Sequence, residues 1–202
     1  MARRRVHDDD TMLDAARDLL VRGGPEAATT AAISARSGAP TGSLYHRYGS
    51  RAGLFAEVWL RTVTRFQAGL LGAAATGTGV ERVLAAADWI VEFADRHPAD
   101  ARLLLQTSRG QLLSDAELPV ETRRTLDDLN RPVADLLHEL AVDVFGTATP
   151  HHVERLTIAM VDVPYAIVRR HLRNGTPAAT HRHLVADTVR ALLDPTRVDP
   201  PG

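Results

Sequence analysis

The sequence predicts an all-α protein, and three observations support this class. Apolar residues recur every three or four positions, and no run alternates apolar and polar residues with the period of two that is typical of a strand. With 45% hydrophobic and 24% charged residues, the 202-residue chain is not disordered. Proline stands at or just before the start of four predicted helices, where its missing N–H costs little: Pro98, Pro119, Pro150 and Pro177.

The first helix is predicted over about residues 9–22, where Leu13, Ala16 and Leu20 form one apolar stripe before a Gly-Gly-Pro stop. A long helix is expected from Ser50 to about Gly72. The remaining predicted helices span residues 80–96, 98–113, 119–145, 150–173 and 179–193, and the Pro-rich tail after them is expected to fray.

Residues 28–49 read as two short helices joined by a tight turn. Thr29 can cap the first helix, because its hydroxyl can accept a hydrogen bond from a backbone N–H of the first turn. Gly38 stands where the helix must end and a positive φ is useful, and Pro40 cannot extend a preceding helix. In the second helix, Leu44 and Tyr48 lie four apart and face a core.

The N-terminal half and outer face of that second helix carry small and hydrogen-bonding residues. Such a surface suits insertion into the major groove of DNA, where side chains must approach base edges closely. The turn residues alone fit a plain helical hairpin equally well.

The wider segment at residues 41–55, with the cap, helix and Gly turn before it, strongly resembles the N-terminal domain of the TetR family of transcriptional regulators. The resemblance is specific over about residues 8–60 and only architectural beyond. It implies that residues 41–48 form the recognition helix. It also implies that Thr29, Tyr45, His46 and Arg51 approach phosphates, and that Thr41, Gly42 and Ser43 face base edges.

Total charge does not by itself indicate a DNA-binding protein. The chain has a formal net charge of −1, and its first 57 residues hold eight arginines against seven acidic residues. The positions of the arginines matter more. Arg3, Arg4 and Arg5 form an expected mobile basic arm, and Arg47 and Arg51 flank the proposed recognition helix, so all five join the predicted DNA-binding set.

The expected organisation is a helix-turn-helix DNA-binding domain over residues 1–52, a larger helical ligand-binding and dimerisation domain over 53–195, and a tail over 196–202. The helix at 150–173 is apolar over a wide arc, which predicts that it meets both its own domain and a partner. A four-helix seam across a two-fold axis would also set two reading helices about 34 Å apart, as successive major grooves require. The predicted homodimer interface is Leu156, Met160, Val163, Ile167, Val185, Val189 and Leu192; the alternative is a helix central to a monomeric core.

Aromatic residues after the first domain, with a few polar neighbours, are the candidates for an effector pocket. Singly, each aromatic residue is better explained as core, but as a set they could line an apolar cavity with polar anchors. The resemblance implies an inducer pocket in this region. The predicted lining is Trp59, Phe66, Trp89, Phe93, Gln106, Arg109 and Tyr165.

Other chemistries find little support. The chain has no cysteine, and the pairs His151-His152 and His181-x-His183 lack further ligands at metal-binding spacing, so neither a metal nor a cofactor is expected. Ser43 and His46 lack an orienting acid, which argues against an enzyme. No apolar run approaches the ~18 residues of a membrane span, and a cytoplasmic location is expected.

These observations predict a ligand-responsive DNA-binding dimer. It is expected to be a repressor that binds a near-palindromic double-stranded operator and is released by a small-molecule effector. The alternative is a helical small-molecule-binding or protein-interaction module whose N-terminal helix-turn-helix domain, its DNA-reading head, is degenerate and no longer binds DNA. That alternative draws on the near-neutral charge and on Ala31 and Thr41, which stand where the family commonly has basic residues.

Overall fold

The computed structural model describes residues 2–110 and 118–194, with side chains from residue 9 onward, and all regular secondary structure in these ranges is helical. The all-α prediction is confirmed. The chain divides into two compact units, which are described separately: residues 1–64 with 99–129, and residues 65–98 with 130–202. No helix in the described ranges is long and apolar enough to span a membrane.

The first unit contains α1 (Ala2–Ala27), α2 (Thr30–Ser37), α3 (Thr41–Tyr48), the first part of α4 (Arg51–Ala73), most of α6 (Pro98–Gln106) and α8 (Val120–Asp128). α1 extends beyond the predicted 9–22 at both ends. Its backbone kinks at Gly23 and at Gly24, where φ is 69°, and helix resumes through Pro25. The Gly-Gly-Pro sequence therefore bends this element and does not end it.

A hydrophobic core joins α1, α2, α3 and the start of α4. Ile33 of α2 and Leu44 of α3 are buried against α1, and α4 adds three large side chains to the same cluster: Leu54, Phe55 and Val58. The domain boundary expected at residue 52 therefore falls within a shared core, and the first unit continues along α4 to Thr64.

Ion pairs also join α1 to its neighbours within this unit. Three of its aspartates each pair with an arginine of a different helix: Asp9 with Arg47 of α3, Asp14 with Arg61 of α4, and Asp18 with Arg36 of α2. In the opposite sense, Arg17 of α1 reaches Asp100 of α6 at 2.8 Å. The Asp100 side chain is only 2% exposed, so removing its arginine partner would leave a buried charge uncompensated and would strongly lower the free energy of unfolding.

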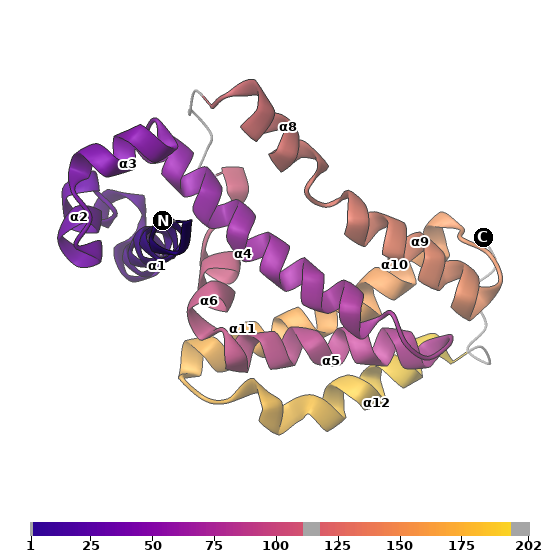
Figure 1. The fold of residues 1–202 in the computed structure, drawn as a ribbon. Helices are drawn as coiled ribbons and strands as arrows, with labels where there is room; N and C mark the ends of the chain where they lie inside the picture. Colours follow the sequence, from indigo (N-terminus) through magenta and orange to yellow (C-terminus); the bar gives the residue numbers. More distant parts are fainter. Residues whose placement is uncertain (1, 111–117, 195–202) are drawn as a thin grey trace. The chain divides into compact units, whose positions relative to one another are not determined.

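The second unit is built around α5 (Val80–Arg96). It packs against α9 (Arg131–Phe145), the π-helical turn η1 (Ile158–Asp162), α11 (Val163–Asn174), the short 3-10 helix η2 (Ala178–His181) and α12 (Arg182–Leu193), and α10 (Pro150–Thr157) packs on α9 and α12 (Figure 1). The buried core includes Val83, Phe93, Leu140, Leu156, Met160 and Val189.

Prolines explain two departures from the predicted helices. The single helix expected over residues 119–145 is two helices, α8 and α9, interrupted at Leu129 and Asn130, because Pro132 has no N–H to donate to the carbonyl four residues back and suits the first turn of a new helix. The helix expected over 150–173 is continuous but contains η1 immediately before Pro164. There the N–H of Val163 donates to the carbonyl of Ile158, five residues back, which is the π-helical pattern.

Two further helices differ at their ends. α6 ends at Gln106, earlier than the expected 98–113, and residues 111–113 lie outside the described part of the chain. The last helix begins with the 3-10 turn η2 before α12. The expected frayed tail at 196–202 also lies outside the described residues.

The Arg17–Asp100 pair makes a stability prediction for the first unit. Arg17→Met would leave the buried Asp100 carboxylate without its guanidinium, and the free energy of unfolding is expected to fall by about 3 kcal/mol, measured by urea denaturation. Arg22→Met at an exposed position of the same helix is the control and should change little. A second substitution, Asp100→Asn, should recover part of the loss. An unchanged stability in Arg17→Met would contradict this role for the pair.

His171 makes a pH prediction for the second unit. Its side chain is buried, its ring centroid lies 4.5 Å from that of His181, and its Nε2 has no hydrogen-bond partner among the described residues. Burial, His181 and Arg170 lower the pKa of His171, outweighing the opposite effect of Asp95. The folded chain therefore resists protonation of this ring more than the unfolded chain does. The contribution of neutral His171 to the free energy of unfolding is therefore fully present above the ordinary histidine pKa. It is lost as the pH falls through and below that value.

Thermal unfolding at pH 7.5 and pH 5.5 checks this sign. The wild-type protein is expected to lose stability at the lower pH, and His171→Gln should lose less because it cannot be protonated there. His138→Gln, at an exposed position of α9, should keep the wild-type difference. An identical pH dependence in His171→Gln and the wild-type protein would contradict the assignment.

Candidate nucleic-acid interface

The turn between α2 and α3 has the geometry that the sequence predicts. The Thr29 hydroxyl oxygen accepts a hydrogen bond from the N–H of Ala32 at 3.1 Å and caps α2. Gly38 ends α2 with φ of 73°, a left-handed conformation that favours glycine. The Ser34 hydroxyl donates to the carbonyl of Ala39 at 2.6 Å, which closes the turn just before Pro40.

α3 is amphipathic, with one side in the core and the other open. Leu44 is 2% exposed, and Tyr48 is partly buried against the same cluster. On the other side, Tyr45 is 51% exposed, and Thr41, Gly42 and His46 are also exposed. Ser43 is partly buried. The structure thus presents most of the predicted base-reading and phosphate-contacting residues of α3 on one accessible face.

Gly42 has no structural reason to be glycine. A Cβ built at this position meets no heavy atom within 4 Å, and its φ is not positive. Glycine in a helix costs roughly 0.5–1 kcal/mol relative to alanine. A position that is exposed, helical and unobstructed, yet occupied by glycine, fits a surface on which another molecule must approach the backbone closely.

The remaining predicted residues flank this face. The Ser50 hydroxyl oxygen accepts from the N–H of Gly53 at 3.0 Å and caps α4, and Arg51 follows in the first turn with its guanidinium carbon 5.4 Å from the centroid of the Phe55 ring. For the basic arm at residues 3–5, the backbone continues α1, while the side chains lie outside the described part of the chain.

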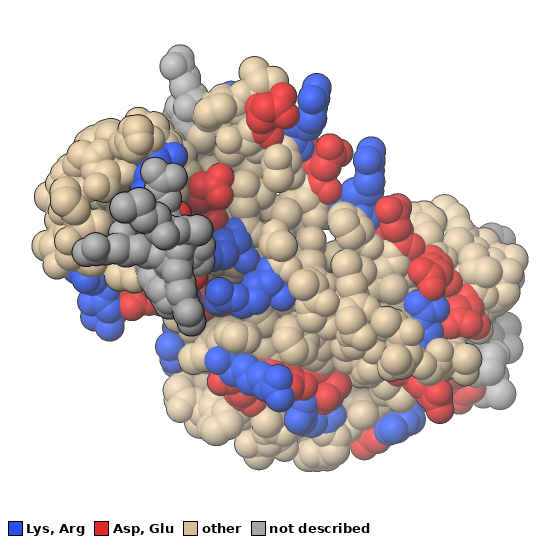
Figure 2. Space-filling view, viewed as in Figure 1, with Lys and Arg blue, Asp and Glu red and all other residues tan. Residues whose placement is uncertain are grey.

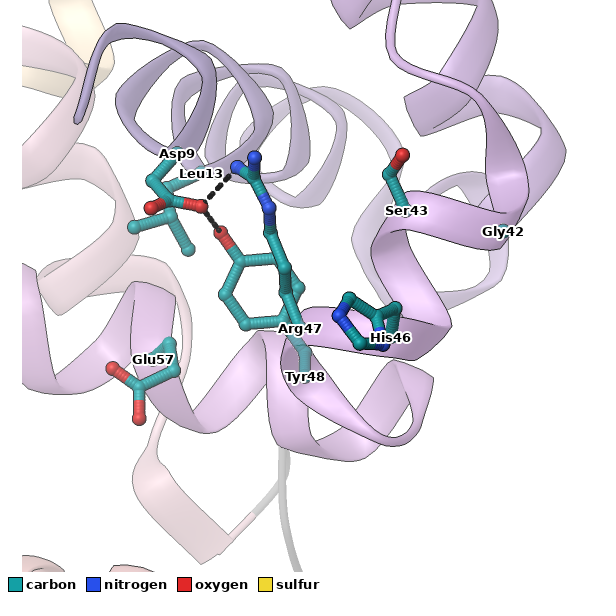
Figure 3. Close-up of a pocket in the computed structure, with 8 residues that line it drawn as sticks. All are labelled: Asp9, Leu13, Gly42, Ser43, His46, Arg47, Tyr48 and Glu57. Carbon is teal, nitrogen blue, oxygen red and sulfur yellow. Dashed lines mark hydrogen bonds and ion pairs between the residues drawn. The ribbon is translucent and has the colours of Figure 1, made fainter. Parts of the chain in front are cut away.

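Arg47 is placed differently from the prediction. It does not project from the outer face of α3; its guanidinium turns toward α1 and donates to the Asp9 carboxylate, which also accepts a hydrogen bond from the Tyr48 hydroxyl at 3.3 Å. Figure 3 shows both side chains reaching toward Asp9. Burial and the charge of Asp9 raise the pKa of Tyr48, so its hydroxyl stays protonated and remains a donor.

Asp9 lies in this region, but the sequence analysis did not include it among the predicted DNA-binding residues. It lies four residues before Leu13 and therefore on the core-facing side of α1, a spacing that could have been noticed. Together with α3 and α4 it borders a pocket of about 760 Å³, lined by Asp9, Leu13, Gly42, Ser43, His46, Arg47, Tyr48 and Glu57.

Several arginines of the first unit form ion pairs with its aspartates. Arg17, Arg36 and Arg47 all contact aspartates of the same unit. Figure 2 shows basic and acidic side chains interspersed on the visible face of the molecule. These arginines are therefore engaged in ion pairs within the protein.

The predicted effector-pocket residues fall in both units. Phe66, Trp89 and Phe93 come together in the second unit: the Phe66 and Phe93 ring centroids are 5.2 Å apart, and the Trp89 indole N–H donates to the Phe66 carbonyl at 3.0 Å. The Trp89 indole also lies over Gly69, where an added Cβ would come within 1.9 Å of it. Phe93 is buried, so this cluster has the close packing of a core.

The other four predicted pocket residues do not join that cluster. Trp59 packs against the hydrophobic core of the first unit. Arg109, also in the first unit, donates to the Leu126 carbonyl and pairs with Asp127, while Gln106 is exposed. Tyr165 of α11 is 39% exposed. Aromatic spacing did not show which residues belong together, because it carries no information about tertiary packing.

Four of the predicted dimer-interface residues are buried within the single chain. Leu156, Met160, Val185 and Val189 are at most 2% exposed, so they form the core of the second unit and are not available to a partner. Val163, Ile167 and Leu192 are partly buried. The helix at 150–173 has the wide apolar arc that the sequence predicts. The buried side of that arc was expected to contact a second copy, but it faces the interior of its own unit, where α5 packs against η1 and α12.

Histidines come together without forming a recognisable metal site. The ring centroids of His181 and His183 are 6.5 Å apart, and those of His151 and His152 are 6.3 Å apart. In the described ranges, no group of three or more histidine, aspartate or glutamate residues could hold a metal ion.

Comparisons with known proteins agree with this geometry. Residues 12–58 match the model of the bacterial regulatory proteins of the tetR family. No curated protein matches the chain by sequence.

Solved structures share the fold over nearly the whole chain. A TetR family transcription regulator from Marinobacter aquaeolei VT8 superposes with a TM-score of 0.75 at 16% identity, covering 95% of this chain and 98% of that one. A TetR-like transcriptional regulator from Rhodococcus sp. RHA1 gives 0.70 at 20% identity, covering 93% and 96%. FadR from Bacillus subtilis, in complex with stearoyl-CoA, gives 0.68 at 11% identity, covering 89% and 96%.

Proposed function

We propose that this chain, which has the N-terminal domain and the fold of TetR-family transcriptional regulators, is a repressor that binds a near-palindromic DNA operator as a homodimer and is released by a small molecule. The observation that carries the proposal is the division of α3: Leu44 fixes one side in the core, and Thr41, Gly42, Tyr45 and His46 remain exposed on the other. A helix held in this way can enter a major groove without disturbing the domain that holds it.

The exposed residues suit two kinds of contact. Thr41 and the backbone at Gly42 stand at the first turn of α3, where side chains of a recognition helix reach base edges. Tyr45 and His46 lie farther along the same face and can donate hydrogen bonds to phosphate oxygens. Thr29 caps α2 and Arg51 begins α4, the helices on either side of α3, and we assign both residues to contacts with the DNA backbone.

A dimer is supported by large apolar side chains that the single chain leaves exposed. Ile158 of η1, Tyr165 of α11 and Leu184 of α12 are 39%, 39% and 45% exposed, and α12 packs against both η1 and α11. These three replace the buried residues of the predicted interface. Exposed apolar side chains on neighbouring helices favour a contact with a second copy.

An effector is supported by one of the similar structures, since FadR from Bacillus subtilis is in complex with stearoyl-CoA. A small molecule bound by the second unit would release DNA if it bound better to a conformation with lower DNA affinity. Phe66, Trp89 and Phe93 are the predicted pocket residues that come together in that unit, and because they pack closely, an apolar ligand bound there would have to separate their rings.

Gly42→Gln tests the proposed role of α3 directly. Because a side chain at this position meets nothing in the protein, the variant should be as stable as the wild-type protein or about 0.5–1 kcal/mol more stable. On DNA, the added side chain would occupy the space next to the base edges. We expect a loss of affinity of at least tenfold for DNA flanking the protein's own gene, measured by gel shift with excess competitor.

Gly72→Gln is the matched control, since Gly72 lies in α4 with the same open surroundings. It should leave DNA affinity unchanged. Equal affinities for the wild-type protein and Gly42→Gln would remove α3 from the interface. Failure of the wild-type protein to bind any duplex, or binding that moderate salt erases for every sequence, would favour the module with a degenerate reading head.

Leu184→Asp tests the dimer. A charge on the proposed face should convert the protein to a monomer at micromolar concentration, as measured by light scattering, with helicity retained. Val142→Asp, at an exposed position of α9, should leave the dimer intact. A wild-type protein with the mass of a monomer would contradict the proposed assembly.

A further inference from the structure

We propose that Asp9 of α1 is an internal competitor for DNA phosphate. In the DNA-free protein its carboxylate holds Arg47, and it gives up that guanidinium when a phosphate of the DNA backbone takes its place. The inference rests on the proposed function and assigns to Asp9 a part in setting how tightly the protein holds DNA of any sequence.

Arg47 lies beside the proposed DNA-binding residues of α3. It belongs to α3, and it lines the same pocket as Gly42, Ser43 and His46, three residues of the predicted DNA-binding set. The side chain of Arg47 is 24% exposed and that of Asp9 is 46% exposed, so the pair lies at the surface beside the proposed reading face (Figure 3). A guanidinium in this position is within the part of the domain that approaches DNA.

The Asp9 carboxylate and a DNA phosphate offer a guanidinium the same kind of contact. A carboxylate and a phosphodiester both accept charge-assisted hydrogen bonds from a guanidinium. Arg47 can therefore pair with Asp9 or with a phosphate, and without DNA it pairs with Asp9. Solvent-exposed ion pairs contribute little to stability, so exchanging Asp9 for a phosphate costs little. Each phosphate neutralised by arginine also releases condensed counterions, which favours the exchange.

Tyr48 is a second hydrogen-bond donor to the Asp9 carboxylate. Its hydroxyl donates to the same carboxylate oxygen that Arg47 contacts, and its ring is partly buried beside Leu44. When Arg47 leaves, Tyr48 can still donate to Asp9, and the carboxylate can be solvated. The anchor of α3 in the core does not depend on the ion pair, so α3 keeps its position while Arg47 changes partner.

The consequence concerns specificity. Arg47 can contact phosphates of any sequence, and neutralising it inside the protein lowers the sequence-independent part of the DNA affinity. Contacts from Thr41 and Gly42 to base edges then make up a larger share of the total. Removing the Asp9 charge should strengthen binding to unrelated DNA. The ratio of the affinity for the operator to the affinity for unrelated DNA should therefore fall.

The test measures binding of the full chain to a random-sequence duplex at several salt concentrations. Asp9→Asn removes the charge and nearly keeps the shape, and we expect it to tighten this binding roughly fivefold, in line with two exposed ion pairs per dimer. Asp9→Glu, which keeps the charge, should bind like the wild-type protein. Asp10→Asn is the matched control, because the neighbouring Asp10 pairs with Arg61 of α4 and not with α3.

A double-mutant cycle separates the proposal from a general charge effect. In an Arg47→Gln background, Asp9→Asn should gain little, because the guanidinium that Asp9 occupies is gone. Arg47→Gln alone should reduce the salt dependence by about one phosphate per chain. Thermal unfolding midpoints of all variants confirm that each one folds.

Three results would overturn the proposal. Weaker binding by a folded Asp9→Asn protein would mean that Asp9 braces Arg47 on DNA. Equal effects of Asp9→Asn and Asp10→Asn would mean that only total charge matters. If the wild-type protein binds no duplex at all, the proposed function fails and this inference fails with it, whereas the first two results leave the proposed function standing.

Discussion

The position of α3 depends on α1, which lies at the centre of the contacts of the first unit. Met12, Leu13 and Leu20 of α1 supply the apolar surface against which Ile33 and Leu44 are buried. Around that core, the aspartates of α1 pair with one arginine each from α2, α3 and α4. Apolar burial provides most of the stability, since exposed ion pairs contribute little. The burial of Leu44 sets which face of α3 turns inward and leaves the other face open, and the ion pairs add links around that core.

The same pairing shapes the electrostatics of the interface. Arginines that would make a conspicuous basic patch are matched by the acidic residues of α1, and the chain as a whole carries a formal charge of −1. A domain of this kind gains less affinity from the DNA backbone than a strongly basic one, so its contacts to base edges must provide more of the discrimination. Arg47 lies between the two roles, because it completes an internal pair in the free protein and stands beside the exposed face.

Local signals in the sequence were sufficient for the turn and for α3. A capping threonine, a glycine with a positive φ and a buried leucine act over four or five residues, and the structure has each where the pattern predicts it, at Thr29, Gly38 and Leu44. Partners distant in the chain were not predictable in this way. Nothing near Arg47 indicates that it turns to Asp9, and the stripe that includes Met160 looks the same whether α5 or a second copy covers it. The interruption before Pro132 and the π-helical turn before Pro164 depended on prolines inside apolar segments, which the helical periodicity obscured.

The exposed face of α3 is proposed to read base edges in the major groove. Methylation interference tests it most directly, because dimethyl sulfate modifies guanine at N7 in the major groove and adenine at N3 in the minor groove. On the DNA fragment that the protein binds most tightly, methylated guanines should block binding at two clusters about one helical turn apart. Interference only at adenine N3, or at a single cluster, would contradict a dimer that places one α3 in each of two successive major grooves.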